Sequence, residues 1–228
     1  MNDFASIVSH DLKAPLRGIQ TMANWLVSDY ADKLDDKGKE NLEMIQERSL
    51  RMTDLINGIL SYSRAGRIQE DRTGLDLETV VHEAIDLIAP PSSIEIVVET
   101  PMPTVRAEKV QVSQVFQNLL GNAVKYMDKT EGHVKVGCLA QNDSWHFYVA
   151  DDGPGIEEQY HERIFQMFST APHPEGKEST GVGLAIVKKI VEGMGGRIWV
   201  QSSPGQGGTF TFALPQKSAV MCDAKSAT

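Results

Sequence analysis

The first sixty residues carry their apolar side chains at helical spacing. In the second half of this segment a stripe recurs at steps of three and four residues in alternation, through Leu42, Ile45, Ser49, Met52, Ile56 and Ile59. A matching stripe comes earlier in the chain, through Ala5, Val8, Leu12, Pro15, Ile19, Met22 and Leu26. This alternation is the heptad pattern of helices that pack along their length. Polar residues 32–38 separate the stripes, so the sequence predicts a helical hairpin over residues 1–65.

Both predicted helices have more apolar surface than a hairpin can bury. Further large apolar residues flank the stripes, namely Phe4, Leu16, Trp25, Leu55 and Leu60. We therefore predict that two copies of the chain form a homodimeric four-helix bundle. Each fully buried Leu, Ile or Met in such a bundle contributes about 1.5 to 3 kcal/mol. The alternative is that the hairpin packs on the second segment of its own chain.

The pattern changes beyond residue 65. Residues 66–74 are polar, show no apolar period and are predicted to be a hinge. Helices are then predicted at 77–88, 109–127 and 182–194, and strands at 94–99, 133–139, 145–150, 197–201 and 209–214. We expect residues 75–215 to form an α+β sandwich with helices on one face of a mixed sheet. The small, polar residues 216–228 are expected to be a disordered tail.

The composition of the chain indicates which binding partners are disfavoured and which cellular compartment is expected. Twenty-two Lys and Arg stand against 31 Asp and Glu, which gives a net charge of -9 and disfavours binding to nucleic acid or anionic lipid. The two cysteines make neither a disulfide framework nor a metal cluster, as expected in a reducing cytosol. No apolar stretch reaches the roughly 20 residues that span a bilayer, and the N-terminus lacks a signal pattern, so we expect a cytoplasmic protein.

Two glycine-containing turns are candidates for contact with a ligand. Asp151-Asp152-Gly153-Pro154-Gly155-Ile156 follows a predicted strand, and its glycines expose backbone against which another molecule can lie. Ser179-Thr180-Gly181-Val182-Gly183-Leu184 opens a predicted helix, whose free N–H groups favour a phosphate. The second turn is not a P-loop, because no Lys-Ser/Thr pair follows its last glycine.

Polar side chains also gather on one face of the helix predicted at 109–127. Asn118, Asn122 and Lys125 are four and three residues apart, with Tyr126 beside them. Asn is a poor residue inside a helix, so two of them one turn apart suggest oxygen ligands for a hard cation such as Mg²⁺. The alternative is ordinary polar packing against the sheet.

A histidine in the first helix can act as a nucleophile. His10 lies just outside the apolar stripe, so we expect its side chain to be exposed. A neutral imidazole is nucleophilic, and Asp11 beside it can accept the remaining ring proton. Pro15 removes a helical hydrogen bond one turn later and should bend the helix there. By itself, a lone surface histidine usually has no function.

Taken in order, these motifs resemble those of two-component sensor histidine kinases. The resemblance covers residues 4–215 and rests on His10-Asp11-Leu12-Lys13-x-Pro15-Leu16, Asn118-Leu-Leu-x-Asn122-Ala-x-Lys125-Tyr126, Asp151-x-Gly153-x-Gly155-Ile156, Ile164-Phe165-x-x-Phe168, Gly181-x-Gly183-Leu184 and Gly195-Gly196, with Gly208-Thr209 and Phe212 in the last strand. The stretch around His10 is also similar to that of kinases attached to phytochrome-like or PAS-type sensors.

The resemblance implies a dimerisation and phosphotransfer hairpin followed by a GHKL-type ATP-binding domain with the Bergerat fold. It implies that His10 accepts phosphate from ATP with Asp11 as its acidic neighbour, that Asn122 binds Mg²⁺, and that Asp151 binds the adenine amino group. The nucleotide-binding residues that it implies are Asn118, Asn122, Lys125, Tyr126, Asp151, Gly153, Gly155, Ile156, Phe168, Lys177, Thr180, Gly181, Val182, Gly183, Leu184 and Thr209. The phosphoryl group would then pass to an aspartate of a response-regulator receiver domain, which would dock near Lys13, Arg17 and Gln20.

This chain departs from the family pattern at two positions. Ala14 stands where relatives with strong phosphatase activity carry Thr or Asn, so we expect weak dephosphorylation of the regulator. Thr170 stands where many relatives carry an Arg, so Lys177 or His173 would supply the cation. We also expect a sensor domain upstream of this chain.

Two other classes of protein stay open at this point. One is a nucleotide-binding dimeric scaffold that signals without transferring phosphate, which the intact His10 and Asn122 disfavour. The other is a GHKL ATPase of the chaperone or topoisomerase kind, which the histidine-bearing hairpin disfavours.

Overall fold

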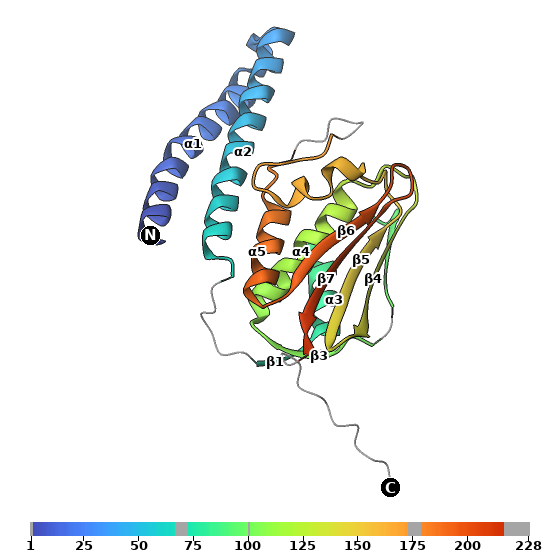
Figure 1. The fold of residues 1–228 in the computed structure, drawn as a ribbon. Coiled ribbons are helices and arrows are strands. Elements are labelled where there is room, and N and C mark those ends of the chain that lie inside the picture. Colours follow the sequence, from blue (N-terminus) through green and yellow to red (C-terminus); the bar gives the residue numbers. More distant parts are fainter. Residues whose placement is uncertain (1, 67–72, 100, 173–178, 217–228) are drawn as a thin grey trace. The chain divides into compact units, whose positions relative to one another are not determined.

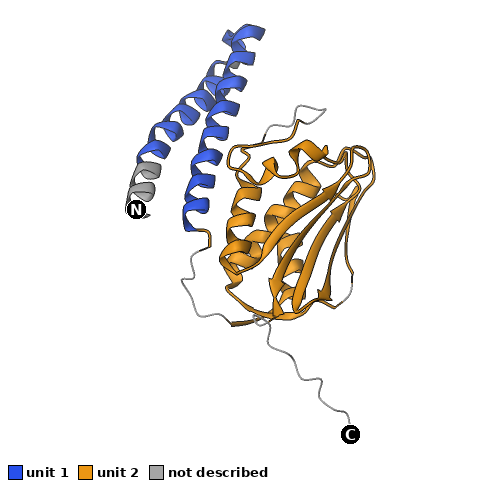
Figure 2. Ribbon diagram, viewed as in Figure 1, with its two compact units in different colours: residues 1–64 blue, residues 65–228 orange. Residues whose placement is uncertain are grey.

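The chain divides into two compact units, Met1–Arg64 and Ala65–Thr228 (Figure 2). The computed structural model describes residues 2–66, 73–99, 101–172 and 179–216, with backbone alone at residues 2–10 and 31. The tail was predicted at 216–228, of which residues 217–228 lie outside the described residues, and the Gln216 amide donates to the Asp143 carbonyl at 2.8 Å. Each unit is described by itself below.

The first unit is the predicted helical hairpin. Helix α1 spans Asn2–Tyr30, a short 3-10 turn spans Ala31–Lys33, and helix α2 spans Asp36–Arg64 (Figure 1). Asp35 stabilises the start of α2, because its carboxylate accepts a hydrogen bond from the Gly38 amide at 2.7 Å. The two helices are also joined by a 2.7 Å hydrogen bond from Gln46 to Asn24.

Half of the predicted α2 stripe is buried within the hairpin, whereas no described residue of the predicted α1 stripe is buried. The buried residues of α2 are Leu42, Ser49 and Ile56, seven residues apart, and they pack against a face of α1 that buries Leu16 and Ala23. The intervening positions of α2, Ile45, Met52 and Ile59, are 40% to 52% exposed. In α1 the predicted stripe is exposed at Leu12, Ile19, Met22 and Leu26. One helical neighbour covers one narrow strip of a helix, so half of the α2 stripe and the described part of the α1 stripe stay exposed in the single chain.

The second unit begins with a small ribbon and a helix. Strand β1 (Thr73–Asp76) pairs antiparallel with β3 (Thr104–Ala107), and Leu75 lies opposite Val105, both buried. This ribbon was not predicted from the sequence, and its first strand takes in the last two residues of the predicted hinge. Helix α3 (Leu77–Ile88) has the predicted bounds; its N-cap Asp76 accepts a hydrogen bond from the Glu78 amide at 3.1 Å.

Five strands form the predicted mixed sheet. Their order is β2 (Ile94–Val98), β4 (Gly132–Gln141), β5 (Ser144–Asp151), β7 (Gly208–Pro215) and β6 (Arg197–Ser202). Only the β2–β4 pair is parallel. Asn142 and Asp143 join β4 to β5 with positive φ of 48° and 57°, the backbone of a tight two-residue hairpin turn.

Helices α3, α4 (Lys109–Lys125) and α5 (Gly183–Gly193) lie on one face of this sheet (Figure 1). Between the layers, the ring of Phe116 on α4 lies 5.6 Å from that of Phe212 and 6.5 Å from that of Phe147. Helix α4 ends two residues before its predicted end, and the short helical turns Glu158–Tyr160 and Arg163–Phe165 precede α5. No helix of the described chain is long and apolar enough to span a bilayer.

Candidate functional site

One side of the candidate site is where α4 meets the start of α5. Asn118 on α4 donates a 2.7 Å hydrogen bond to the Gln114 carbonyl, which holds its side chain in place. Its Oδ1 atom lies so close to Gly183 that a Cβ on that glycine would be 2.6 Å away. Helix α5 therefore begins against α4, and its N-cap Val182 makes no side-chain hydrogen bond to the first turn. The free amides of this turn are suited to bind an anion.

The other predicted residues of α4 lie on the same face. Asn122 is partly buried, and its carbonyl accepts a hydrogen bond from the Tyr126 amide at 3.0 Å. Lys125 lies with Nζ 5.5 Å from the centre of the Tyr126 ring. The described residues hold no group of three or more His, Cys, Asp and Glu that could bind a metal. An amide oxygen beside an anion site fits Mg²⁺ held by one or two protein ligands and by phosphate oxygens.

Asp151 lies at the end of β5, on the second side of the site. Its Oδ1 accepts a 3.0 Å hydrogen bond from the Gly153 amide, and the Gly208 amide of β7 also donates to its carboxylate. Burial raises the pKa of this carboxyl, and the nearby charges of Asp152 and Asp128 raise it further, whereas the two amide hydrogen bonds oppose them. The result is a carboxylate acceptor in a partly dehydrated position.

The turn after Asp151 packs backbone to backbone against the turn between β6 and β7. A Cβ on Gly155 would overlap the Ser203 carbonyl oxygen, and one on Gly207 would overlap the Asp151 carbonyl oxygen. Both glycines have left-handed backbone, with φ of 75° and 72°. The Gly205 amide donates to the Pro154 carbonyl at 2.7 Å. This packing gives Gly155 a structural reason to be glycine.

Ser202 connects the same two turns and was missed by the sequence analysis. Its hydroxyl accepts a 2.8 Å hydrogen bond from the Ile156 amide and donates a 2.6 Å bond to the Gly207 carbonyl. The only sequence signal nearby is the glycine-rich stretch 203–208 between the last two predicted strands.

Phe168 and Gly181 meet at the edge of the site. The Phe168 amide donates to the Gly181 carbonyl at 2.9 Å, and both residues have left-handed backbone, with φ of 62° and 64°. The Phe168 side chain is 56% exposed, whereas Val182 is buried and Thr180 and Leu184 are partly buried. Lys177 and His173 lie outside the described residues.

Thr209 lies on the opposite face of the sheet from the helices that carry Asn118 and Gly183. It pairs with Ala150 across β5 and β7, and it lines a groove of about 580 Å³ together with Tyr148 and Trp199. Side chains alternate along a strand, so the buried Phe210 faces the helices and Thr209 faces the open side of the sheet. This placement does not support Thr209 as a nucleotide-binding residue.

The remaining predicted residues belong to the first unit. His10 lies in α1, but its side chain is outside the described residues, so its exposure stays a prediction. Asp11, the next residue of the helix, is exposed.

Two family sequence models match the chain, one in each unit. The model of the His Kinase A (phospho-acceptor) domain matches residues 1–67, and that of the histidine kinase-, DNA gyrase B- and HSP90-like ATPases matches residues 107–218. The chain is 40% identical over 219 residues to cyanobacterial phytochrome B of Nostoc sp. (strain PCC 7120), covering 94% of this chain and 29% of that protein. It is 36% identical over 220 residues to the methanogenesis regulatory histidine kinase FilI of Methanothrix harundinacea, covering 94% and 24%.

A solved structure is similar over nearly the same range. The crystal structure of full-length ShkA in complex with AMPPNP is 30% identical, has a TM-score of 0.70, and is matched over 94% of this chain and 46% of that one. The chain thus spans less than a third of the two relatives and less than half of this structure's chain. The two domain matches in their order and the similarity along almost the whole chain show that it belongs to the sensor histidine kinases and comprises their catalytic core.

Proposed function

We propose that this chain transfers the γ-phosphoryl group of ATP to His10 and then passes it to an aspartate of a response-regulator receiver domain. The observation that carries the proposal is that one chain matches a phospho-acceptor domain over residues 1–67 and an ATPase domain over residues 107–218. In the second unit, Asn118 lies against Gly183 at the start of α5, and backbone amides hold the Asp151 carboxylate. The AMPPNP bound to the similar ShkA chain supports ATP as the nucleotide.

Each part of the second unit has a role in holding ATP. The Asp151 carboxylate would accept a hydrogen bond from the adenine amino group, because it is partly dehydrated and fixed by two backbone amides. The free amides at the start of α5 would bind phosphate oxygens, with Lys125 adding positive charge. Asn122 would hold Mg²⁺, which neutralises the phosphate charge that develops during transfer.

The transfer step itself needs positioning more than acid–base chemistry. One imidazole nitrogen of His10 forms a bond to the γ-phosphorus as the bond to the bridging oxygen breaks, and ADP leaves with the electron pair. Asp11 accepts the proton from the other ring nitrogen. Holding the two reactants in line accounts for most of the rate gain in such a step.

The exposed half of the hairpin's heptad pattern supports a homodimer. Ile45, Met52 and Ile59 on α2 and Leu12 and Ile19 on α1 are large, apolar and exposed in the single chain. A second copy would cover them in a four-helix bundle. Residues 13–20 of α1, just after His10, would form the docking face for the receiver domain, and Ala14 would limit its dephosphorylation.

Radiolabelled ATP tests the proposal directly. With γ-labelled ATP, we expect a protein label that is stable in alkali and lost in acid, and that is absent from His10→Gln. His82→Gln is the matched control, because His82 is an exposed histidine on α3 and should leave the label unchanged. A receiver domain added afterwards should remove the label from the wild-type chain.

The same assay separates the alternatives. ATP hydrolysis without labelled protein would indicate an ATPase of the chaperone or topoisomerase kind. Nucleotide binding with neither label nor hydrolysis would indicate a scaffold.

A further inference from the structure

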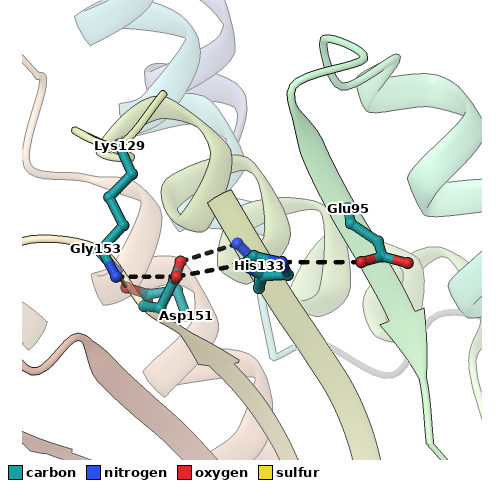
Figure 3. A network of polar contacts seen from close by, with 6 residues as sticks. Glu95, Lys129, His133, Asp151 and Gly153 are labelled. Atoms are coloured by element: carbon teal, nitrogen blue, oxygen red, sulfur yellow. Dashed lines mark hydrogen bonds and ion pairs between the residues drawn. The ribbon is translucent and has the colours of Figure 1, made fainter. Parts of the chain in front are cut away.

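Asp152, the residue after the predicted adenine-binding aspartate, joins three segments of the second unit. Figure 3 shows the network of polar contacts that includes Lys129, His133 and Gly153. The Oδ1 atom of Asp152 accepts a 2.8 Å hydrogen bond from the His133 amide, and its Oδ2 accepts one at 2.9 Å from Lys129 Nζ. The ring of His133 also contacts Oδ2, with Nδ1 at 3.3 Å. The Asp152 amide in turn donates to the His133 carbonyl at 3.2 Å.

Two of these segments, which carry Lys129 and Asp152, belong to opposite sides of the candidate site. Lys129 follows the end of α4 by four residues, and that helix carries Asn118 and Asn122. Asp152 lies between Asp151 and Gly153, whose amide positions the Asp151 carboxylate. The ion pair between Lys129 and Asp152 therefore links the helix of the phosphate side to the turn of the base side.

We propose that Lys129 and Asp152 are positioning residues for nucleotide binding, because their ion pair fixes the position of the Asp151 turn relative to the end of α4. The proposal rests on the proposed ATP-dependent function. Neither Lys129 nor Asp152 is among the predicted nucleotide-binding residues. They act through Asp151 and α4 and need not touch the nucleotide.

An exposed ion pair alone would be a weak argument, since such pairs contribute little to stability. This one differs because Asp152 is held from several directions at once. Burial acts to raise the pKa of its carboxyl, but the hydrogen bonds from the His133 amide and Lys129 outweigh it and lower the pKa. The carboxylate is therefore ionised at neutral pH. The Asp152 side chain is 34% exposed, its carboxylate accepts from the His133 amide of β4, and its own amide donates to the His133 carbonyl. Asp152 is therefore a fixed anchor for Lys129.

A second ion pair, shorter by only 0.1 Å, provides the control. Lys109 at the start of α4 contacts Glu83 of α3 at 2.8 Å, and both side chains are about half exposed, like that of Lys129. This pair joins two helices at the other end of α4, where no predicted site residue lies.

The experiment measures ATP affinity and turnover in the full chain. We expect Lys129→Met to raise the Kd for ATP and the KM of autophosphorylation about fivefold, which is at the upper end of the effects of partly exposed ion pairs. The kcat at saturating ATP should stay within about twofold, because the bound reactants are unchanged. Lys129→Arg keeps the positive charge and should retain the wild-type Kd. Asp152→Asn, which keeps an acceptor for the His133 amide, should resemble Lys129→Met.

Lys109→Met should leave the Kd and the KM unchanged. An unchanged Kd in Lys129→Met, or a raised Kd in Lys129→Arg, would overturn the inference while leaving the kinase proposal intact. A wild-type chain that binds no ATP would refute the proposed function itself, and this inference with it.

Discussion

Gly155 and Gly205 have the same left-handed backbone, with φ of 75° at each, but very different surroundings. A Cβ on Gly155 would overlap the Ser203 carbonyl oxygen, whereas a Cβ on Gly205 would meet nothing within 4 Å. The two residues therefore separate the cost of an unfavourable φ from the cost of close backbone packing.

We expect Gly205→Ala to lower the free energy of unfolding by about 1 kcal/mol, the cost of a left-handed alanine. Gly155→Ala should lower it by about 3 kcal/mol or more and weaken ATP binding, because the two turns must also move apart. Thermal unfolding of the full chain and nucleotide titration would measure both effects. Equal losses in the two variants would contradict the packing argument.

Asp151 and Asp152 are adjacent carboxyls whose pKa values are shifted in opposite directions. The pKa of Asp151 is raised, chiefly by burial, and that of Asp152 is lowered because its hydrogen bonds outweigh its burial. Between the ordinary pKa of an aspartate and the raised pKa of Asp151, the folded state binds more protons than the unfolded state. Ionised Asp151 therefore reduces stability as pH rises through that window, and the penalty persists at neutral pH.

Asp151→Asn should accordingly raise the melting temperature at pH 7, and this gain should shrink as the pH falls toward 4. The same change should weaken ATP binding about tenfold, because a charged acceptor is lost. Asp152→Asn should have the opposite effect on stability and lower the melting temperature at pH 7. Melting curves between pH 4 and pH 8 would test both signs; a less stable Asp151→Asn at pH 7 would contradict the assignment.

At the scale of the element, the hairpin helices present two kinds of exposed apolar residue. Met52 of α2 is 52% exposed and lies on the heptad stripe, whereas Leu50 is 58% exposed and lies off it. Exposure alone does not distinguish them. Only the stripe position would be buried by a second copy of the chain.

Met52→Glu should therefore raise the dimer dissociation constant at least about a hundredfold, because the dimer interface would then bury two glutamate charges, one from each copy. Leu50→Glu should change it less than about threefold. Sedimentation of the full chain over a range of concentrations would measure both constants. A similar effect of the two substitutions would show that the stripe is not the interface.

At the scale of the whole molecule, the second unit has a core of its own. Phe116, Phe147 and Phe212 are fully buried between its helices and its sheet, and every described residue with a predicted role in nucleotide binding belongs to this unit. The histidine belongs to the other unit. The proposal thus assigns nucleotide binding and phosphate acceptance to two different compact units of one chain.

Residues 65–228 expressed alone should bind ATP with a Kd within about twofold of that of the full chain, because a buried core can sustain a domain of this size. The fragment should acquire no phosphoryl label, since it lacks His10. Calorimetric titration and the labelling assay would test the two statements. A Kd more than about tenfold weaker would show that the hairpin contributes to the nucleotide site.

Local patterns were sufficient for much of this protein. The periodicity of apolar residues predicted the hairpin and the helix at 77–88, and it predicted the helix at 109–127 except for its last two residues. These features depend on neighbours a few residues apart, so a sequence contains the information directly. The ordered motifs likewise identified the family, because each glycine turn, like the asparagine pair, is a short segment that can be recognised without the fold.

Features that join distant segments required the tertiary structure. The β1–β3 ribbon, the link from Ser202 to Ile156 and the ion pair between Lys129 and Asp152 each join residues more than twenty positions apart. The face of the sheet on which Thr209 lies follows from its register with Ala150. A shift of one residue along a strand reverses which side chains face the core, and only the packed fold selects one register.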